Sequence, residues 1–319
     1  MITPTDMQVI RDYNGRPRPT PVVVLGAFDG VHLGHQALLG KARGIGGDCT
    51  VVCFEPLPRE YFAAQANAAA SSKMPESLTP RLCSAAQRLA LLHDHGIAQV
   101  WQMRFNEPLA ATPPADFVRH VIAGRLRSHT VVVGEDYRFG YRGAGDLALL
   151  QQLGDDLGFA VKPVAAVLAQ GERISSTRIR QALQRGDLST AAALLGRPYT
   201  VCGRVRHGRR LGRDLGYPTL NLSPPGKVLA VNGVIAVRAR LSGESQWRAG
   251  VANLGTRPTV GGVEPLVEVH LFDYQGNLYG RRVQVQLIEK LRDEAHFPSI
   301  DDMVEQMHRD AAQARRILM

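Results

Sequence analysis

Two different patterns follow one another along this sequence, and the change between them limits the folds that the chain can adopt. Up to about residue 195, short runs of β-branched and aliphatic residues alternate with segments of helical periodicity. From Tyr199 onward, short β-branched runs follow one another directly, separated by Gly, Pro and Asn. Strands that alternate with helices form parallel sheets covered by helices, whereas strands in close succession form antiparallel barrels or sandwiches. We therefore expect an α/β domain followed by a β domain.

The first half is predicted to begin with a tail or edge segment over residues 1–20. A buried strand at Pro21–Leu25 follows, then a turn containing glycines and a helix with Leu33, Ala37, Leu38 and Ala42 on one face. Residues 63–76 are small and polar and are predicted to form a loop, although their alanines also permit a helix. The further strands predicted here are 50–54, 99–103, 130–133 and 160–167, and the further helices are 84–92, 115–123, 146–157, 177–185 and 189–195.

The second half is predicted to be an antiparallel barrel or sandwich closed by one amphipathic helix near the end of the chain. We place the first domain at residues 1–186, a linker at 187–197 and the second domain at 198–319. In the closing helix, Ile300, Met303, Val304 and Met307 are expected to face the core, and the predicted strands are 199–205, 233–241, 247–253, 266–273 and 282–289.

Charge and composition exclude few functions. The net charge is +9, with 38 basic and 29 acidic residues. Such a charge is compatible with binding to nucleic acid, with binding to phosphorylated small molecules, or with a compositional bias that serves no binding function. No apolar run approaches the roughly 18 residues of a membrane span, and the first residues lack the pattern of a signal peptide. We expect a cytoplasmic protein with no membrane partner. Its cysteines are predicted to be buried free thiols, namely Cys49, Cys53, Cys83 and Cys202.

The segment GAFDGVHLGH, from Gly26 to His35, carries the strongest local signal for a function. It joins a predicted strand to a predicted helix, whose N-terminus offers unpaired N–H groups and partial positive charge to a phosphate. His32 and His35 lie one turn apart, and imidazole donors there would hold the charge that builds on a leaving pyrophosphate. The plain alternative is a pair of surface histidines. The candidate phosphate-binding residues are Gly26, Phe28, Asp29, Gly30, His32, Gly34 and His35.

This segment resembles the HxGH signature of the nucleotidyltransferase superfamily, whose members join a nucleoside monophosphate to an acceptor. The second signature of that family is a turn rich in Ser and Thr, which here is ISSTRIR, residues 174–180. A Ser or Thr would cap the following helix. The backbone N–H groups of its first turn, together with an arginine, would bind a triphosphate. The resemblance assigns that clamp to Ser176, Thr177 and Arg178, and roles in catalysis to His32 and His35.

Two further segments resemble the flavin-adenylylating branch of the same superfamily. They are FEPLPREYF at residues 54–62 and VGEDYRFG at residues 133–140, and both follow predicted strands. Ligands of α/β sheets bind beyond the carboxyl ends of the strands, so these segments are candidates for a flavin site. Ala27 stands where many relatives carry Asn, and we leave it out of the site. The flavin-binding residues expected from the resemblance are Phe54, Pro56, Asp136 and Phe139.

The second half contains LGRDLGYPTLNL, residues 211–222, in which Gly212 and Gly216 permit a tight loop beside phosphate. In an extended segment, Thr219 and Asn221 point to the same side. A hydroxyl and an amide oxygen suit Mg²⁺, which keeps some of its waters and shares a substrate phosphate. A turn in which both side chains cap backbone groups would also account for this pattern.

Glu268 lies in the alternating strand LVEVHL, where it shares a face with His270. A carboxylate there could take a proton from an attacking hydroxyl, although a solvated strand face would look the same. From Gly196 to Leu318 the segments resemble riboflavin kinase, in which the Pro-Thr-x-Asn motif binds ATP and Mg²⁺ and the Glu is the base. Leu220 and Ile235 depart from that pattern, since Ala and Tyr are usual there.

Taken together, nearly the whole chain resembles the bacterial bifunctional riboflavin kinase/FAD synthetase family. The resemblance implies a Rossmann-like nucleotidyltransferase domain with a parallel sheet, followed by an antiparallel β-barrel with a closing α-helix. It further implies phosphorylation of riboflavin to FMN and adenylylation of FMN to FAD, with ATP and Mg²⁺ required. The partners expected are these small molecules and no nucleic acid.

Two other functions remain open from the residues alone. The chain could be a nucleotidyltransferase with a single function, acting on pantetheine phosphate or nicotinamide mononucleotide, with an accessory barrel. It could also bind RNA through the basic stretch from Arg204 to Arg213. RNA readers place stacking aromatic side chains among their cations, and this stretch has only Tyr217 near its end, which argues against the second possibility.

Overall fold

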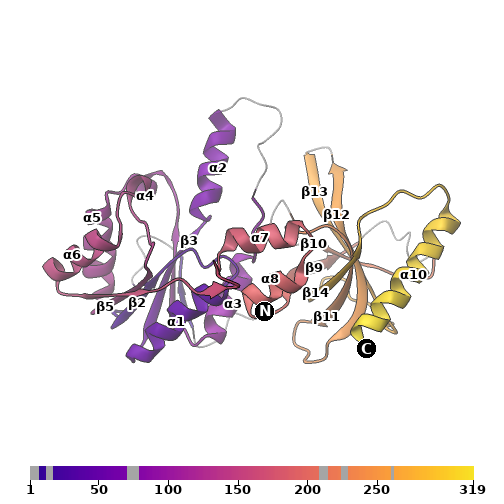
Figure 1. Ribbon diagram of the computed structural model, residues 1–319, viewed down its shortest axis with the longest axis horizontal. Coiled ribbons are helices and arrows are strands. Elements are labelled where there is room, and N and C mark those ends of the chain that lie inside the picture. Colours follow the sequence, from indigo (N-terminus) through magenta and orange to yellow (C-terminus); the bar gives the residue numbers. More distant parts are fainter. Residues whose placement is uncertain (1–6, 12–16, 70–78, 208–214, 224–228, 260–261) are drawn as a thin grey trace. The chain divides into compact units, whose positions relative to one another are not determined.

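The computed structural model describes residues 7–11, 17–69, 79–207, 215–223, 229–259 and 262–319 (Figure 1). The chain forms two compact units. We call residues 2–78 and 88–174 the α/β unit, and residues 79–87 and 175–319 the barrel unit.

The α/β unit is built on a six-stranded sheet with the order β1-β4-β3-β2-β5-β6, in which all neighbours are parallel. The order reverses between β2 and β5, so the sheet has the doubly wound arrangement that was expected. Its strands are β1 (Gln8–Ile10), β2 (Val22–Leu25), β3 (Cys49–Glu55), β4 (Gln99–Arg104), β5 (Thr130–Gly134) and β6 (Ala160–Val164).

Helices cover both faces of this sheet, because the strands are apolar on both sides. Val23 and Leu25 face one core and Val22 and Val24 the other, so that every side chain of β2 is buried. The helical segments between residues 33 and 157 are α1 (Leu33–Ile45), α2 (Pro58–Ala69), α3 (Ala85–Asp94), α4 (Glu107–Ala110), α5 (Pro114–Phe117), the π-helix η1 (Val118–Leu126), the 3₁₀ turn η2 (Tyr141–Gly143) and α6 (Leu147–Leu157).

The predicted strands of the first half are confirmed, and β1 is the expected edge strand. The loop expected over residues 63–76 is wrong where the structure describes it, since α2 continues to Ala69. Alanine has the highest helix propensity, which explains why a segment of small residues extends this helix. The patterns also missed a short hairpin of β7 (Leu168–Ala169) and β8 (Glu172–Arg173).

The barrel unit contains a closed antiparallel barrel with the order β10-β13-β12-β11-β14-β9. The expected antiparallel barrel is therefore confirmed. Its strands are β9 (Tyr199–Arg206), β10 (Leu220–Ser223), β11 (Gly233–Leu241), β12 (Arg248–Thr259), β13 (Gly262–Leu271) and β14 (Arg282–Arg292), and its helices are α7 (Ser176–Gln184), α8 (Leu188–Leu195) and α10 (Ile300–Leu318). The predicted linker 187–197 is thus occupied mainly by α8, whose apolar side chains are buried.

Helix α10 closes the barrel as predicted, but its buried face lies further along the chain than expected. Ile300 is 64% exposed, whereas Ala314 and Leu318 are buried and Met307 packs half-buried beside them. The buried carboxylate of Asp310 fixes this face, because Arg292 of β14 donates to both of its oxygens at 2.8–3.1 Å. A buried charge is stable only when it is paired in this way, so the ion pair determines which part of α10 contacts the barrel.

All four cysteines are free thiols, as expected from the sequence; Cys49, Cys53 and Cys83 are buried, whereas Cys202 is half-buried. Burial raises the pKa of Cys49 and of Cys202 to about 12, and it also raises the pKa of Cys53. Within the described ranges, no group of three or more His, Cys, Asp and Glu side chains is placed to hold a metal ion.

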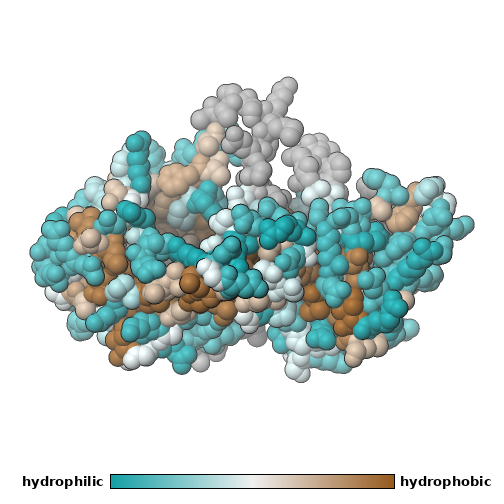
Figure 2. All heavy atoms as spheres, in the orientation of Figure 1, coloured by the Kyte–Doolittle hydropathy of each residue, from teal (hydrophilic) through white to brown (hydrophobic). Residues whose placement is uncertain are grey.

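The surface in Figure 2 is mostly hydrophilic, with hydrophobic groups exposed in separate patches. In the described part of the chain, no helix combines the length and apolar character needed to cross a membrane.

The thiols should react slowly with DTNB in the native protein at pH 8, because the thiolate is the reactive form and burial disfavours it. We expect all four to react rapidly once the chain is unfolded in guanidinium. The absorbance of released thionitrobenzoate measures both stages. A rapid native reaction of Cys49 or Cys53, located by peptide mapping, would contradict the buried placement of these side chains.

Candidate functional site

The turn after β2 brings the two predicted histidines together at the start of α1. His32 is the N-cap residue, and its Nδ1 accepts a hydrogen bond from the backbone N–H of His35 at 3.4 Å. The two imidazole rings are stacked, with centroids 3.7 Å apart. Because Nδ1 of His32 accepts, the ring proton of its neutral form resides on Nε2. The imidazole N–H of His32 therefore lies on Nε2, in a ring at the N-terminus of a helix, where anions bind.

Two glycines of this turn are required by its geometry. Gly30 has a φ of +83°, a left-handed conformation that glycine adopts without strain. A Cβ at Gly34 would lie 3.2 Å from the His32 ring and 3.6 Å from the carbonyl oxygen of Ile174. A side chain at Gly34 would therefore require the His32 ring to shift by a few tenths of an ångström.

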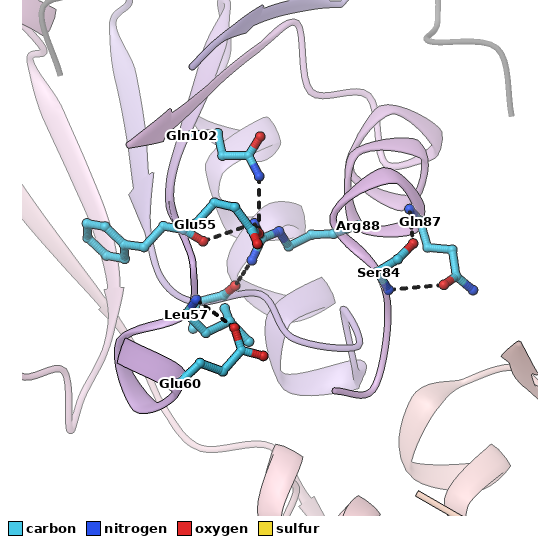
Figure 3. A network of polar contacts seen from close by, with 9 residues as sticks. Glu55, Leu57, Glu60, Ser84, Gln87, Arg88 and Gln102 are labelled. Carbon is cyan, nitrogen blue, oxygen red and sulfur yellow. Dashed lines mark hydrogen bonds and ion pairs between the residues drawn. The ribbon is translucent and has the colours of Figure 1, made fainter. Parts of the chain in front are cut away.

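A buried arginine from α3 is bonded to this turn and to the end of β3, and Figure 3 shows its contact with Glu55. Arg88 is 2% exposed, and its guanidinium donates to the carbonyl oxygens of Ala27 at 3.1 Å and Phe54 at 3.0 Å. It also forms an ion pair with Glu55 at 2.9 Å, and Gln102 donates to the same carboxylate oxygen at 3.4 Å. One side chain therefore joins the turn after β2 to the end of β3.

Asp29, expected to contact phosphate, is almost fully buried and forms an ion pair with Arg59 at 2.9 Å. Arg59 lies at the start of α2, in the FEPLPREYF segment. The ion pair thus joins the segment from Gly26 to His35 to the FEPLPREYF segment. The link holds α2 against the turn that carries the histidines, and it places positive charge beside that turn.

Aromatic rings gather where β3 and β4 end. Phe54 and Phe105 pack edge to face with centroids 5.6 Å apart, and Tyr61 and Phe62 of α2 contact Phe105 at 5.3 and 5.8 Å. Pro56 lies between Phe54 and α2 in the sequence. This edge of the sheet therefore offers an aromatic surface, of which Phe62 is half exposed.

The segment after β5 divides into an exposed part and a buried part. Asp136 is exposed and paired with Arg173 of β8, with one contact at 2.8 Å. Phe139 is 6% exposed and packs against Phe117 and Tyr137 in the core. The structure thus gives Phe139 a packing role, while Asp136 lies at the surface beyond the end of β5.

Parallel pairing explains why these segments meet. The carboxyl ends of parallel strands lie at one edge of the sheet, so the residues after β2, β3 and β5 share that edge. The reversal of strand order between β2 and β5 places the histidine turn at the switch point, where doubly wound sheets bind ligands.

The ISSTRIR segment forms the start of α7 in the barrel unit. The capping residue is Ser175, whose Oγ accepts a hydrogen bond from the N–H of Arg178 at 3.2 Å. Ser176 and Thr177 therefore occupy the first turn, where backbone N–H groups have no partner within the helix. Ser176 and Arg178 are half-buried and Thr177 is exposed.

In the barrel, strand register places three polar residues in one row. Glu268 of β13 lies directly opposite Asn221 of β10 and directly opposite Asn253 of β12. Residues opposite each other in antiparallel strands point to the same face, with Cβ atoms about 4.5–5.5 Å apart. The neighbours Val267 and Val269 are buried, so this row lies on the outer face of the barrel.

Thr219 lies just before β10 and shares the side of Asn221 by alternation. Gly216 has a φ of +79° in the turn that precedes it, and Gly212 lies outside the described residues. Burial raises the pKa of Tyr217, the residue two positions before Thr219. Of the two departures from the expected pattern, Ile235 is fully buried and Leu220 is opposite Val269 in the ladder.

Two residues of these sites, Arg88 and Asn253, were not predicted from the sequence. Arg88 was part of a helix with ordinary amphipathic periodicity, so only its burial reveals a role. Asn253 interrupts an apolar strand, a signal that could have been found, and its Nδ2 donates to Glu294 at 3.4 Å. Its Oδ1 is buried and has no hydrogen-bond partner among the residues that the structure describes.

Two family models together match nearly the whole chain. A family model described as FAD synthetase matches residues 16–178, and one described as riboflavin kinase matches residues 195–318. A crystal structure described as a macrolide-efflux protein from Streptococcus pneumoniae has a TM-score of 0.81 and 30% identity, covering 97% of this chain and 99% of that one. The fold is therefore shared over nearly the whole chain.

Curated relatives extend the match to both halves at once. The bifunctional riboflavin kinase/FMN adenylyltransferase of Escherichia coli (strain K12) is 40% identical, covering 96% of this chain and 95% of the relative. That of Pseudomonas fluorescens is 39% identical, covering 98% of both. The chain belongs to the bifunctional riboflavin kinase/FMN adenylyltransferase family. Neither a nucleotidyltransferase of single function nor an RNA-binding module is favoured by these matches.

Replacing Arg88 with Met should lower the free energy of unfolding of the α/β unit by about 2–4 kcal/mol. The change removes two part-buried hydrogen bonds from a charged donor to the carbonyl oxygens of Ala27 and Phe54, at about 1–2 kcal/mol each. Urea denaturation followed by circular dichroism measures the loss. Arg119→Met is the matched control, because its ion pair with Asp116 is exposed and contributes little. Equal stability of the two variants would contradict the supporting role of Arg88.

Proposed function

We propose that the outer face of the barrel transfers the γ-phosphate of ATP to the 5′-hydroxyl of riboflavin, giving FMN and ADP. The observation that carries this proposal is the register that sets Glu268 directly opposite Asn221, two residues after Thr219. The carboxylate is thereby held opposite an amide, and the hydroxyl of Thr219 follows on the same side by alternation; both groups suit a nucleotide phosphate. Phosphoryl transfer needs positioning and charge neutralisation more than covalent chemistry by the protein.

In this reaction Glu268 acts as the general base. The ribityl oxygen forms a bond to the γ-phosphorus while the bond from that phosphorus to the bridging oxygen of ADP breaks, and the hydroxyl proton passes to the carboxylate. Gly212 and Gly216 belong to the loop that we assign to the phosphates, and Thr219 and Asn221 bind the nucleotide.

The donor set of Thr219 and Asn221 fits Mg²⁺, a hard cation that prefers oxygen ligands and is commonly shared between protein and phosphate. When bound, the ion would supply neutralisation of the phosphate charge. The neighbouring carboxylate of Glu268 adds negative charge on the same face, which further suits a divalent cation.

We further propose that the α/β unit adenylylates FMN with a second ATP. A phosphate oxygen of FMN attacks the α-phosphorus, and pyrophosphate leaves with the electrons of the broken bond. The stacked pair His32 and His35 would stabilise that leaving charge, with Gly26, Phe28, Gly30 and Gly34 shaping the turn. Asp29 contributes by holding Arg59. Ser176, Thr177 and Arg178 are proposed to bind phosphate at the start of α7.

The flavin of this second reaction is assigned to the edge where β3 and β5 end. Phe54 and Pro56 would contact its ring, supported by the aromatic group around Phe105. Asp136 is retained as a polar contact, whereas Phe139 supports the site from within the core. We place both reactions in the cytoplasm, which agrees with four free thiols.

His32→Ala combined with His35→Ala should abolish conversion of FMN to FAD and spare conversion of riboflavin to FMN. Loss of one donor to developing charge typically costs about 10²–10³ in rate, so the double change should exceed that. Chromatography of flavins after incubation with Mg-ATP measures both activities on one preparation. His93→Ala combined with His120→Ala is the control, since these histidines lie in α3 and η1 and not in the turn. Equal loss of both activities would point to unfolding instead.

Glu268→Gln should have the opposite effect. Gln is nearly isosteric but cannot accept a proton at neutral pH, so riboflavin phosphorylation should fall by about 10²–10⁴. Supplied FMN should still become FAD. The matched control is Glu264→Gln, on the same strand four residues earlier. Phosphorylation at the wild-type rate in the Glu268 variant would remove this residue from catalysis.

A further inference from the structure

A histidine on β13 is bonded to the segment that carries Thr219. His270 lies two residues after Glu268 and therefore on the same outer face of the barrel. Its Nδ1 lies 3.0 Å from the carbonyl oxygen of Pro218, the residue immediately before Thr219. Because a carbonyl oxygen only accepts, Nδ1 is the donor, and the neutral ring has its proton on that nitrogen.

The sheet itself does not fix Thr219. The pairing of β10 with β13 and β9 begins at Leu220 and Asn221, respectively, so Thr219 lies outside the ladder. The residues before it are held by side chains instead. The ring of Tyr217 packs against His270 with centroids 4.9 Å apart, and its hydroxyl is hydrogen-bonded to Nδ1 of His308 on α10.

We propose that His270 is a positioning residue for the phosphorylation of riboflavin. By holding the carbonyl of Pro218, it fixes the peptide that leads into Thr219 and so sets the affinity for Mg-ATP. This inference rests on the nucleotide-binding role proposed above for Thr219. Strand β13 then carries both the general base and the residue that aligns the nucleotide segment with it.

The inference predicts a selective defect. A net hydrogen bond contributes about 0.5–1.5 kcal/mol, which corresponds to roughly two- to tenfold in an equilibrium constant. His270→Leu should therefore raise the KM for Mg-ATP by about that factor. The KM for riboflavin should change less than about twofold, because we assign Pro218 to the nucleotide segment and not to the flavin.

The experiment compares variants of the full-length chain. His270→Asn retains an amide N–H close to the position of imidazole Nδ1 and should restore the KM for Mg-ATP toward the wild-type value. His270→Gln places its amide further from the backbone and should not restore it. His296→Leu, an exposed histidine before α10, is the control for loss of an imidazole. Adenylylation of supplied FMN reports on the integrity of each preparation.

A raised KM for Mg-ATP alone in His270→Leu, with recovery in His270→Asn, supports the inference. Equal rises in both KM values, or no difference between the Asn and Gln variants, would overturn it. Should His270→Leu fail to fold, the comparison of Asn with Gln still decides.

Thr219→Val separates this inference from the proposal on which it rests. If this change leaves the KM for Mg-ATP unaltered, the role proposed for Thr219 fails, and the role of His270 with it. If Thr219→Val raises that KM but His270→Leu does not, only the inference about His270 is overturned.

Discussion

The guanidinium of Arg88 lies where two parallel strands end, and much of the α/β unit depends on its bonds. It donates to the backbone of Ala27 and Phe54, which follow β2 and end β3, and it is paired with Glu55. An unpaired buried charge would be strongly destabilising, so the two strand ends must adopt the geometry that satisfies it. The histidine turn and the aromatic edge are thereby held at a fixed separation within this unit.

In the barrel, strand register alone determines where the residues of the proposed site lie. Alternation puts Val267 and Val269 inside and Glu268 outside, and pairing on both sides sets Asn221 and Asn253 opposite the carboxylate. A shift of one residue would turn the whole polar row into the barrel core, which burial of charge forbids. The need to keep charged side chains out of the barrel core thus determines both the strand register and the geometry of the site.

Most strands of the α/β unit could be predicted because their side chains are apolar on both faces, which gives continuous β-branched runs. The segments that escaped prediction are those that show neither a helical periodicity of apolar residues nor the alternation of a strand. Helix α2 extends through residues that were expected to form a loop, and the hairpin of β7 and β8 is too short to show alternation. In α10, periodicity identified the helix but not its buried face, which the ion pair between Asp310 and Arg292 sets.

The sequence by itself determined the order of elements, the class of each half and the residue types of both sites, because spacing and side-chain chemistry are local properties. It also contained Glu268, Thr219 and Asn221 as separate signals. Only the tertiary structure decided which side chains meet: that Asn253 stands opposite Glu268, that Arg88 binds the turn after β2, and that Phe139 packs in the core. These relations join residues far apart in the chain, and they depend on strand pairing and burial, which no local pattern encodes.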